Sequence, residues 1–141
     1  MKELFNVMFN HDDRLFSRQE IIEAMQGADV LVPTVTDKID ADMIAQASPN
    51  LKLIANFGNG VDNIDVDAAH EKGITVTNTP SVLTEDTADM VMALLLALPR
   101  RMVEGDRVMR VPGSFSGWSP NWMLGRRLAG KKLGIVGMGR I

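Results

Sequence analysis

Residues 51–76, LKLIANFGNGVDNIDVDAAHEKGITV, decide the fold class of this chain. The segment begins with the apolar run Leu51–Phe57, which predicts a buried strand, and ends with a second short strand at Ile74–Val76. Between them Asp65 is a favourable N-cap and predicts a helix over Val66–Lys72 that stops at Gly73. A strand, a helix and a strand joined by short links are typical of a parallel sheet covered by helices.

The residues before this segment repeat the same alternation. Ser17-Arg-Gln-Glu20 is a capping-box pattern, and it predicts a helix that stops at Gly27. Leu4–Phe9 and Asp29–Val32 are apolar runs that we predict as strands, and Asp40–Ala47 is predicted as a helix capped by Asp40. The resulting order β-α-β-α-β-α-β predicts an α/β domain with a parallel sheet.

The longest predicted helix begins at Thr84-Glu-Asp-Thr87, with Thr84 as its N-cap and acidic residues in its first turn. Pro99 lacks a backbone N–H and therefore predicts a kink or a split near Leu95–Leu98. One face of this helix carries a continuous apolar stripe, made of Val91, Leu94, Leu95, Leu98 and Met102.

Two glycine loops that follow predicted strands are the candidate binding sites. Gly58-Asn59-Gly60 is open to two interpretations: a tight turn with positive φ, or a nest of backbone N–H groups that suits a substrate carboxylate. Residues 133–141, LGIVGMGRI, predict a final strand that runs into Gly137-x-Gly139. This pattern fits either a tight turn or the first two glycines of G-x-G-x-x-G, whose backbone N–H groups bind a dinucleotide pyrophosphate. The third glycine of that motif would be the residue after Ile141.

Composition excludes several other classes of function. A net charge of −3 gives no electrostatic reason to expect nucleic acid or an anionic membrane as a partner. The longest apolar run, Met90–Leu98, is too short to span a bilayer, and no cysteine is present, so we expect a soluble cytoplasmic protein. His11 and His70 have no second ligand at metal spacing, so we expect no metal site. Trp118 and Trp122 are expected to be buried in this chain or in a neighbouring one.

The run LKLIANFGNGVDNIDVDAAHEKGITVTNTPSVLTEDTADMVMALLLALPRR, followed by GW-SP-W-LG and LAGKKLGIVGMGRI, resembles the D-isomer-specific 2-hydroxyacid dehydrogenases, and most of all their glyoxylate/hydroxypyruvate reductase branch. The resemblance implies a flavodoxin-like substrate domain over residues 1–83. It implies a linker and dimerisation helix with a tryptophan-containing loop over residues 84–130. The beginning of a Rossmann cofactor domain is expected over residues 131–141.

The resemblance also implies an activity: NAD- or NADP-dependent interconversion of a 2-oxo acid and a D-2-hydroxy acid. The backbone N–H groups of Asn59 and Gly60 would hold the substrate carboxylate, and Trp118 would reach the active site of the partner subunit in a homodimer formed through the helix at residues 84–110. The residues implied to bind the cofactor are Thr87, Gly137, Gly139, Arg140 and Ile141.

The chain departs from the family pattern at both ends. The catalytic arginine, glutamate and histidine would lie beyond Ile141, and the first strand and helix of the family are missing, so we expect this chain alone to be inactive. Pro99 and Asn59 are also unusual at their positions.

Two alternatives stay open from the sequence. One is a non-catalytic NAD-sensing or dimerisation module of the same fold family. The other is a phospho-receiver domain of flavodoxin-like fold, which the missing phosphoacceptor aspartate and lysine partner disfavour.

Overall fold

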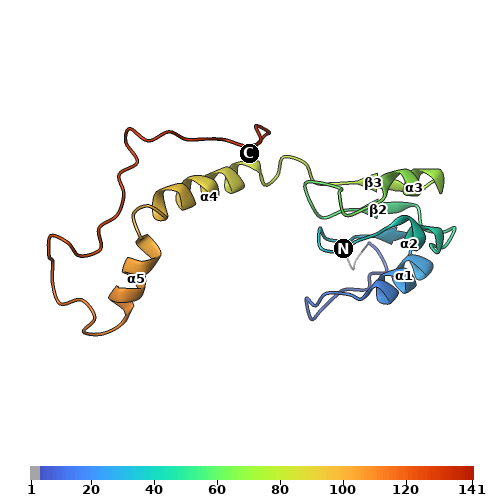
Figure 1. Cartoon of the computed structure of the whole chain (residues 1–141). Coiled ribbons are helices and arrows are strands. Elements are labelled where there is room, and N and C mark those ends of the chain that lie inside the picture. Colours follow the sequence, from blue (N-terminus) through green and yellow to red (C-terminus); the bar gives the residue numbers. More distant parts are fainter. Residues whose placement is uncertain (1–3) are drawn as a thin grey trace. The chain divides into compact units, whose positions relative to one another are not determined.

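A computed structural model of the chain describes residues 4–141, and these divide into two compact units with the boundary between Pro80 and Ser81. The first unit contains α1 (Arg18–Gly27), β1 (Val30–Leu31), α2 (Ala41–Ala45), β2 (Leu53–Ala55), α3 (Val66–Glu71) and β3 (Thr75–Thr77) (Figure 1). The second unit contains α4 (Thr84–Ala97) and α5 (Met102–Arg110).

The first unit is an α/β layer structure with a parallel sheet in the order β1-β2-β3, which confirms the predicted fold class. Val30 pairs with Leu53, and Leu53 pairs with Thr75, so the strands advance across the sheet in chain order. Because successive crossovers run in one direction, α2 and α3 lie on the same face of the sheet, and α1 packs beside α2 on that face. The hydrophobic core fills the space between this row of helices and the sheet.

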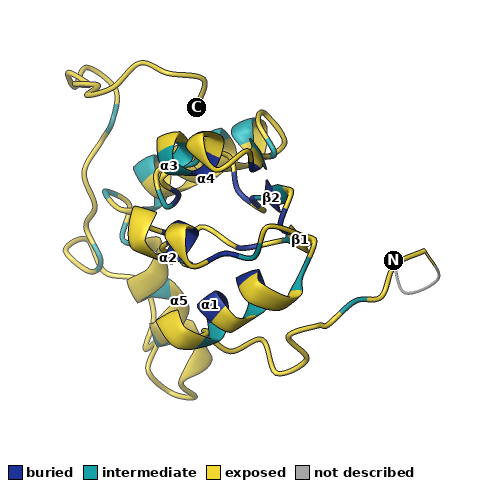
Figure 2. Ribbon diagram, turned by 90° about the vertical axis from the view of Figure 1, so that its right-hand side faces the viewer, coloured by how far each residue is buried: buried dark blue, intermediate teal, exposed yellow. Residues whose placement is uncertain are grey.

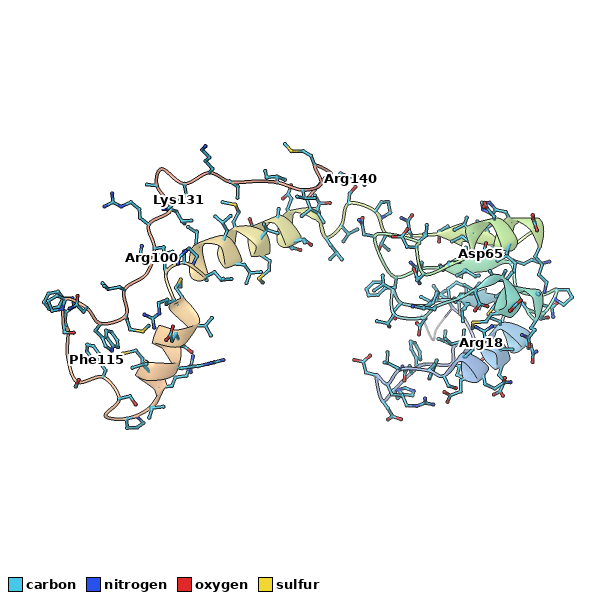
Figure 3. The ribbon with its side chains drawn as sticks, in the orientation of Figure 1. Arg18, Asp65, Arg100, Phe115, Lys131 and Arg140 are labelled. Carbon is cyan, nitrogen blue, oxygen red and sulfur yellow. The ribbon has the colours of Figure 1, made fainter. Side chains whose placement is uncertain are left out.

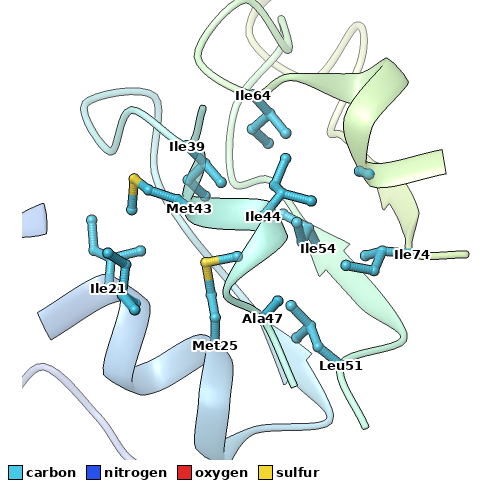
Figure 4. Packing of buried hydrophobic residues seen from close by; sticks show 12 residues of the cluster. Ile21, Met25, Ile39, Met43, Ile44, Ala47, Leu51, Ile54, Ile64 and Ile74 are labelled. Carbon is cyan, nitrogen blue, oxygen red and sulfur yellow. The ribbon is translucent and has the colours of Figure 1, made fainter. Parts of the chain in front are cut away.

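The core is aliphatic and well packed (Figure 4). Ile54, at the centre of β2, is fully buried, and α2 contributes Met43 and Ile44 above it. The buried side chains lie on the helix faces turned toward the sheet, while the outer faces are exposed (Figure 2). The complete set of buried apolar residues is Ile21, Ile22, Met25, Ile39, Met43, Ile44, Ala47, Leu51, Ile54, Ile64, Ala69 and Ile74.

Local capping signals set where the helices of the first unit begin. The capping box at Ser17 and Glu20 forms in both directions: the Glu20 amide donates to Ser17 Oγ, and the Ser17 amide donates to Glu20 Oε2 at 2.8 Å. Asp40 accepts a hydrogen bond from the Met43 amide, and Asp65 accepts one from the Ala68 amide. These predicted caps are confirmed, and α3 ends before Gly73, whose φ of 75° is the left-handed value expected after a helix.

Two predicted strands do not form. Leu4–Phe9 and the segment Leu133–Val136 are irregular and exposed, and Val136 is fully solvent-accessible. A strand is stable only when a neighbouring strand satisfies its backbone N–H and C=O groups. Within the described residues neither segment has such a neighbour, so apolar composition alone does not produce a strand there.

The predicted long helix is split, as Pro99 indicates. α4 ends at Ala97, and α5 begins at Met102 after a turn in which Arg101 has a φ of 54°. The N-cap is Leu83 rather than Thr84, which is already helical, and Leu83 makes no side-chain capping bond. The predicted cap at Thr84 is therefore wrong by one residue. The first turn is held instead by Thr87, whose amide and hydroxyl both donate to the Leu83 carbonyl.

Candidate functional site

Three loops meet at the carboxyl edge of the sheet in the first unit. Because β1, β2 and β3 are parallel, the residues that follow them lie along the same edge. In open parallel sheets this is the edge at which ligands bind. The loop after β2 contains the glycine sequence Gly58-Asn59-Gly60, the first of the two candidate sites.

The carbonyl groups of this glycine loop are all held by the protein. The Thr79 amide donates to the Gly58 carbonyl at 2.9 Å, and Asn78 Nδ2 donates to the Asn59 carbonyl at 2.7 Å. From the other side, Asn56 Nδ2 donates to the Gly60 carbonyl at 2.7 Å. Three successive peptide groups are thus fixed by donors that come from the ends of β2 and β3.

Fixing these carbonyls also fixes the direction of the next N–H groups. No described peptide bond is cis, and in a planar trans peptide the N–H points opposite to the C=O of the preceding residue. The N–H groups of Asn59, Gly60 and Val61 therefore point away from the donors that hold the loop. Asn59 and Gly60 are both exposed residues at the edge where open parallel sheets bind ligands.

The backbone of the loop differs from the tight-turn interpretation. Positive φ angles among the described residues occur elsewhere, and none of the three loop residues adopts the left-handed region. Gly58 is required for space instead: a Cβ built on it would lie 2.2 Å from Val35 Cγ1 and 3.3 Å from Asn56 Nδ2. The loop is therefore pressed closely against the residues that follow β1.

A buried asparagine pair, which the sequence alone did not predict, supports the loop from within. Asn56 is only 1% exposed, and its amide exchanges two hydrogen bonds of 3.2 Å with the amide of Asn63. Asn63 Nδ2 also donates to the carbonyls of Thr34 and Asp37 at 3.1 Å, which ties the loop after β1 to the loop after β2. An asparagine at the end of an otherwise apolar strand was the available signal, because a buried amide must be hydrogen-bonded.

The ionisable groups with shifted pKa values in the first unit belong to helix starts rather than to the glycine loop. The guanidinium of Arg14 and the Ser17 amide and hydroxyl lower the pKa of Glu20 to about 2. The guanidinium of Arg18 and the Met43 amide lower the pKa of Asp40. Both carboxylates are exposed, and both stabilise the N-terminus of a helix.

The second candidate site, at residues 133–141, has one feature of a glycine turn. Gly137 has a φ of 86°, a conformation that favours glycine, whereas nothing lies within 4 Å of a Cβ built on Gly139. Arg140 donates to Ser81 Oγ at 2.9 Å beside the first turn of α4 (Figure 3). An open hollow of about 500 Å³ lies there, lined by Ser81, Val82, Thr84, Glu85, Asp86 and Arg140.

The remaining predicted site residues are not assembled with this turn. Thr87 is exposed on α4 and uses its hydroxyl in the bond to the Leu83 carbonyl. Ile141 is exposed as well. Trp118 is 80% exposed and Trp122 is 41% exposed, so neither tryptophan is buried within this chain, although the ring centroids of Trp122 and Phe115 lie 5.3 Å apart. The predicted contact of Trp118 with a neighbouring subunit stays a prediction.

Residues 4–141 contain no group of three or more histidine, aspartate or glutamate side chains that could hold a metal ion. None of the described helices is long and apolar enough to cross a membrane.

Comparisons with known proteins match the whole chain. The family described as D-isomer specific 2-hydroxyacid dehydrogenase, catalytic domain, matches residues 2–129. A glyoxylate reductase of Korarchaeum cryptofilum is 47% identical over 141 residues, which are 100% of this chain and 42% of that protein. The chain thus spans less than half the length of the curated relatives that it matches.

Solved structures agree with this assignment. A protein of Polaromonas sp. JS6 66, described as an NAD-binding member of the same family, has a TM-score of 0.86 at 41% identity, over 99% of this chain and 43% of that one. A D-lactate dehydrogenase of Aquifex aeolicus, complexed with NAD and lactic acid, has a TM-score of 0.59 at 32% identity, over 74% and 30% of the two chains.

Proposed function

Because the chain belongs to the D-isomer specific 2-hydroxyacid dehydrogenases, an oxidoreductase family, we propose that it provides the substrate-binding part of an enzyme that interconverts a 2-oxo acid and a D-2-hydroxy acid. The glyoxylate reductase relative favours a small substrate of the glyoxylate or hydroxypyruvate type. The observation that carries the proposal is the glycine loop, whose three carbonyls are held by the protein.

In this proposal the loop binds the carboxylate that all 2-oxo and 2-hydroxy acids share. The N–H groups of Asn59 and Gly60 donate to the two carboxylate oxygens, and their direction is set before the substrate arrives. A preorganised site loses little conformational freedom on binding, which favours affinity for a ligand of only a few atoms. The loop thereby holds the adjacent carbonyl or hydroxyl carbon in a fixed place for hydride transfer.

The cofactor is proposed to be NAD or NADP, held at the second glycine sequence. Gly137 has the left-handed φ that a pyrophosphate-binding turn uses, and Gly139, Arg140 and Ile141 would complete that turn. Thr87, in the first part of α4, would lie toward the nicotinamide. When bound, the nicotinamide donates or accepts the hydride, while the residues of this chain orient the acid.

We expect the 141-residue chain to show no turnover when it is assayed alone. Hydride transfer requires the nicotinamide in line with the substrate carbon and a proton donor within hydrogen-bond reach. Residues 133–141, which this proposal assigns to the cofactor, are exposed and form no helix or strand, so we expect them not to hold the nicotinamide in line when the chain is alone. Turnover by the purified chain would contradict this expectation.

The carboxylate site is tested by a matched pair of ligands, D-lactate and D-lactamide, which differ in the carboxylate alone. Titrated into the ¹⁵N-labelled chain, D-lactate should shift the amide resonances of Asn59 and Gly60, while D-lactamide should leave them unchanged. Gly27, at the end of α1, provides a reference amide in the same unit. Equal shifts with both ligands, or none with either, would contradict carboxylate binding at the loop.

We further propose that α4 and α5 form the contact between two copies of the chain. α4 contains no buried residue, and its exposed apolar side chains surround it: Met90, Val91, Met92, Leu94 and Leu96 are each at least half exposed. A helix that is apolar on all sides is normally covered by protein. In such a dimer Trp118 would reach the partner subunit, which would account for its exposure in a single chain.

The dimer is tested by measuring the mass in solution by light scattering. Leu94→Glu places a charge on α4 and should shift the mass from two chains to one, whereas Lys132→Glu, outside the helices, should leave it unchanged. A wild-type monomer would refute the contact.

A non-catalytic NAD-sensing or dimerisation module would use the same exposed helix. The carboxylate site distinguishes the two proposals, because only the enzyme requires it.

A further inference from the structure

We infer that Asn78 is a positioning residue for the substrate: its side chain fixes the direction of the Gly60 N–H that binds the carboxylate, without contacting the carboxylate itself, and Asn56 fixes the next peptide of the loop, between Gly60 and Val61. This inference rests on the proposed carboxylate-binding function of the glycine loop. It assigns a role to two side chains that lie outside the glycine sequence.

Asn78 is brought to the loop by the register of the parallel sheet. Ala55 pairs with Thr77, and the Asn56 amide donates to the Thr77 carbonyl at 2.8 Å, so the residue after β3 lies beside the residues after β2. From there Asn78 Nδ2 donates to the Asn59 carbonyl at 2.7 Å. The N–H that this bond orients is that of Gly60, because the Asn59 carbonyl and the Gly60 N–H belong to one planar peptide.

Asn56 acts on the following peptide from the interior. Its Nδ2 donates to the Gly60 carbonyl at 2.7 Å and thereby orients the N–H of Val61. The side chain cannot turn over, because Asn63 accepts from Asn56 Nδ2 and donates to Asn56 Oδ1. A reversed Asn56 amide would place its oxygen against the Gly60 carbonyl, which would leave two buried acceptors without a donor.

Asn63 is itself fixed in one orientation. Its Nδ2 faces the carbonyls of Thr34 and Asp37, which are both acceptors. The orientation of the loop therefore depends on a sequence of donors and acceptors that begins after β1, passes through Asn63 and Asn56, and ends at the Gly60 carbonyl.

The experiment compares Asn78→Ala, which removes the donor, with Asn78→Gln, which keeps an amide donor. Asn78 is exposed, so both variants should fold. Asn50→Ala is the matched control, because Asn50 is also exposed but precedes β2, at the opposite edge of the sheet. Each ¹⁵N-labelled chain is titrated with D-lactate, and the orientation of the Gly60 N–H is measured without ligand from residual dipolar couplings.

We expect Asn78→Ala to raise the Kd for D-lactate about fivefold, the equivalent of one net hydrogen bond of ~1 kcal/mol, and to change the Gly60 coupling. Asn78→Gln should recover most of the affinity, and Asn50→Ala should match wild type in both measurements. Asn56→Ser should alter the Val61 coupling in the same way, provided that its amide spectrum shows a folded first unit.

An Asn78→Ala chain with wild-type affinity and an unchanged Gly60 coupling would overturn the inference and leave the proposed function intact. A wild-type chain that does not distinguish D-lactate from D-lactamide would instead contradict the proposed function. In that case the couplings measured without ligand would still decide whether Asn78 sets the direction of the Gly60 N–H.

Discussion

Replacing Gly58 by alanine should destabilise the first unit, mainly through a steric contact with Val35. A Cβ at this position would lie 2.2 Å from Val35 Cγ1, more than 1 Å inside the 3.4 Å at which ordinary contact begins. Overpacking of this kind costs about 1–3 kcal/mol. Gly58 has no left-handed φ, so alanine causes no backbone strain there. Alanine also lowers the conformational entropy of the unfolded chain, which stabilises the folded state by about 0.4–1 kcal/mol. The expected net loss for Gly58→Ala is therefore about 1 kcal/mol.

The double variant Gly58→Ala/Val35→Ala tests this reasoning. Val35 is 56% exposed, so Val35→Ala alone should cost less than about 1 kcal/mol. Without the valine methyl groups only the 3.3 Å contact with Asn56 Nδ2 stays tight, so the destabilisation by Gly58→Ala should become much smaller. The effect of Gly58→Ala should thus differ clearly between the two backgrounds. Gly27→Ala is the control, because nothing lies within 4 Å of a Cβ built there.

The assay must report the first unit alone. Both tryptophans, Trp118 and Trp122, belong to the second unit, so tryptophan fluorescence would not follow the unfolding of the sheet. Urea unfolding followed through the methyl resonances of Ile54, which is fully buried in β2, meets this requirement. An equal loss of stability from Gly58→Ala in both backgrounds would refute the steric explanation.

Three further predictions concern contacts outside the loop. Arg14 lowers the pKa of Glu20 from 4.5 to about 2, so the stability that the Glu20 carboxylate contributes is complete above pH 4.5 and is lost as the pH falls toward 2. Glu20→Gln should remove this part of the acid dependence of urea unfolding, and an unchanged pH profile would contradict the prediction. Lys72 Nζ donates to three carbonyls at the end of α2, so Lys72→Met should cost about 1–3 kcal/mol in urea unfolding, and a loss no larger than for Lys52→Met would refute the cap. A Cβ on Gly125 would lie 2.6 Å from the Pro99 carbonyl oxygen, so Gly125→Ala should displace this loop and shift tryptophan emission, whereas unchanged emission would show that the contact is not required.

The sequence by itself determined the helices of the first unit, because their signals are local. Ser17, Asp40 and Asp65 each accept a hydrogen bond from the amide three residues ahead, and each helix begins where its cap predicts. The split at Pro99 follows from the missing N–H of one residue. The glycine loop after β2 was also identified from the sequence, and so was the family to which the chain belongs.

The tertiary structure alone decided which apolar runs became strands and how the glycine loop is held. Leu53–Ala55 is a strand because β1 and β3 lie on either side of it, whereas Leu4–Phe9 has comparable composition and no neighbour within the described residues. Strand pairing and the bond from Asn78 to Asn59 both join residues far apart in sequence. Such contacts depend on the register of the sheet, which no local pattern of residues specifies.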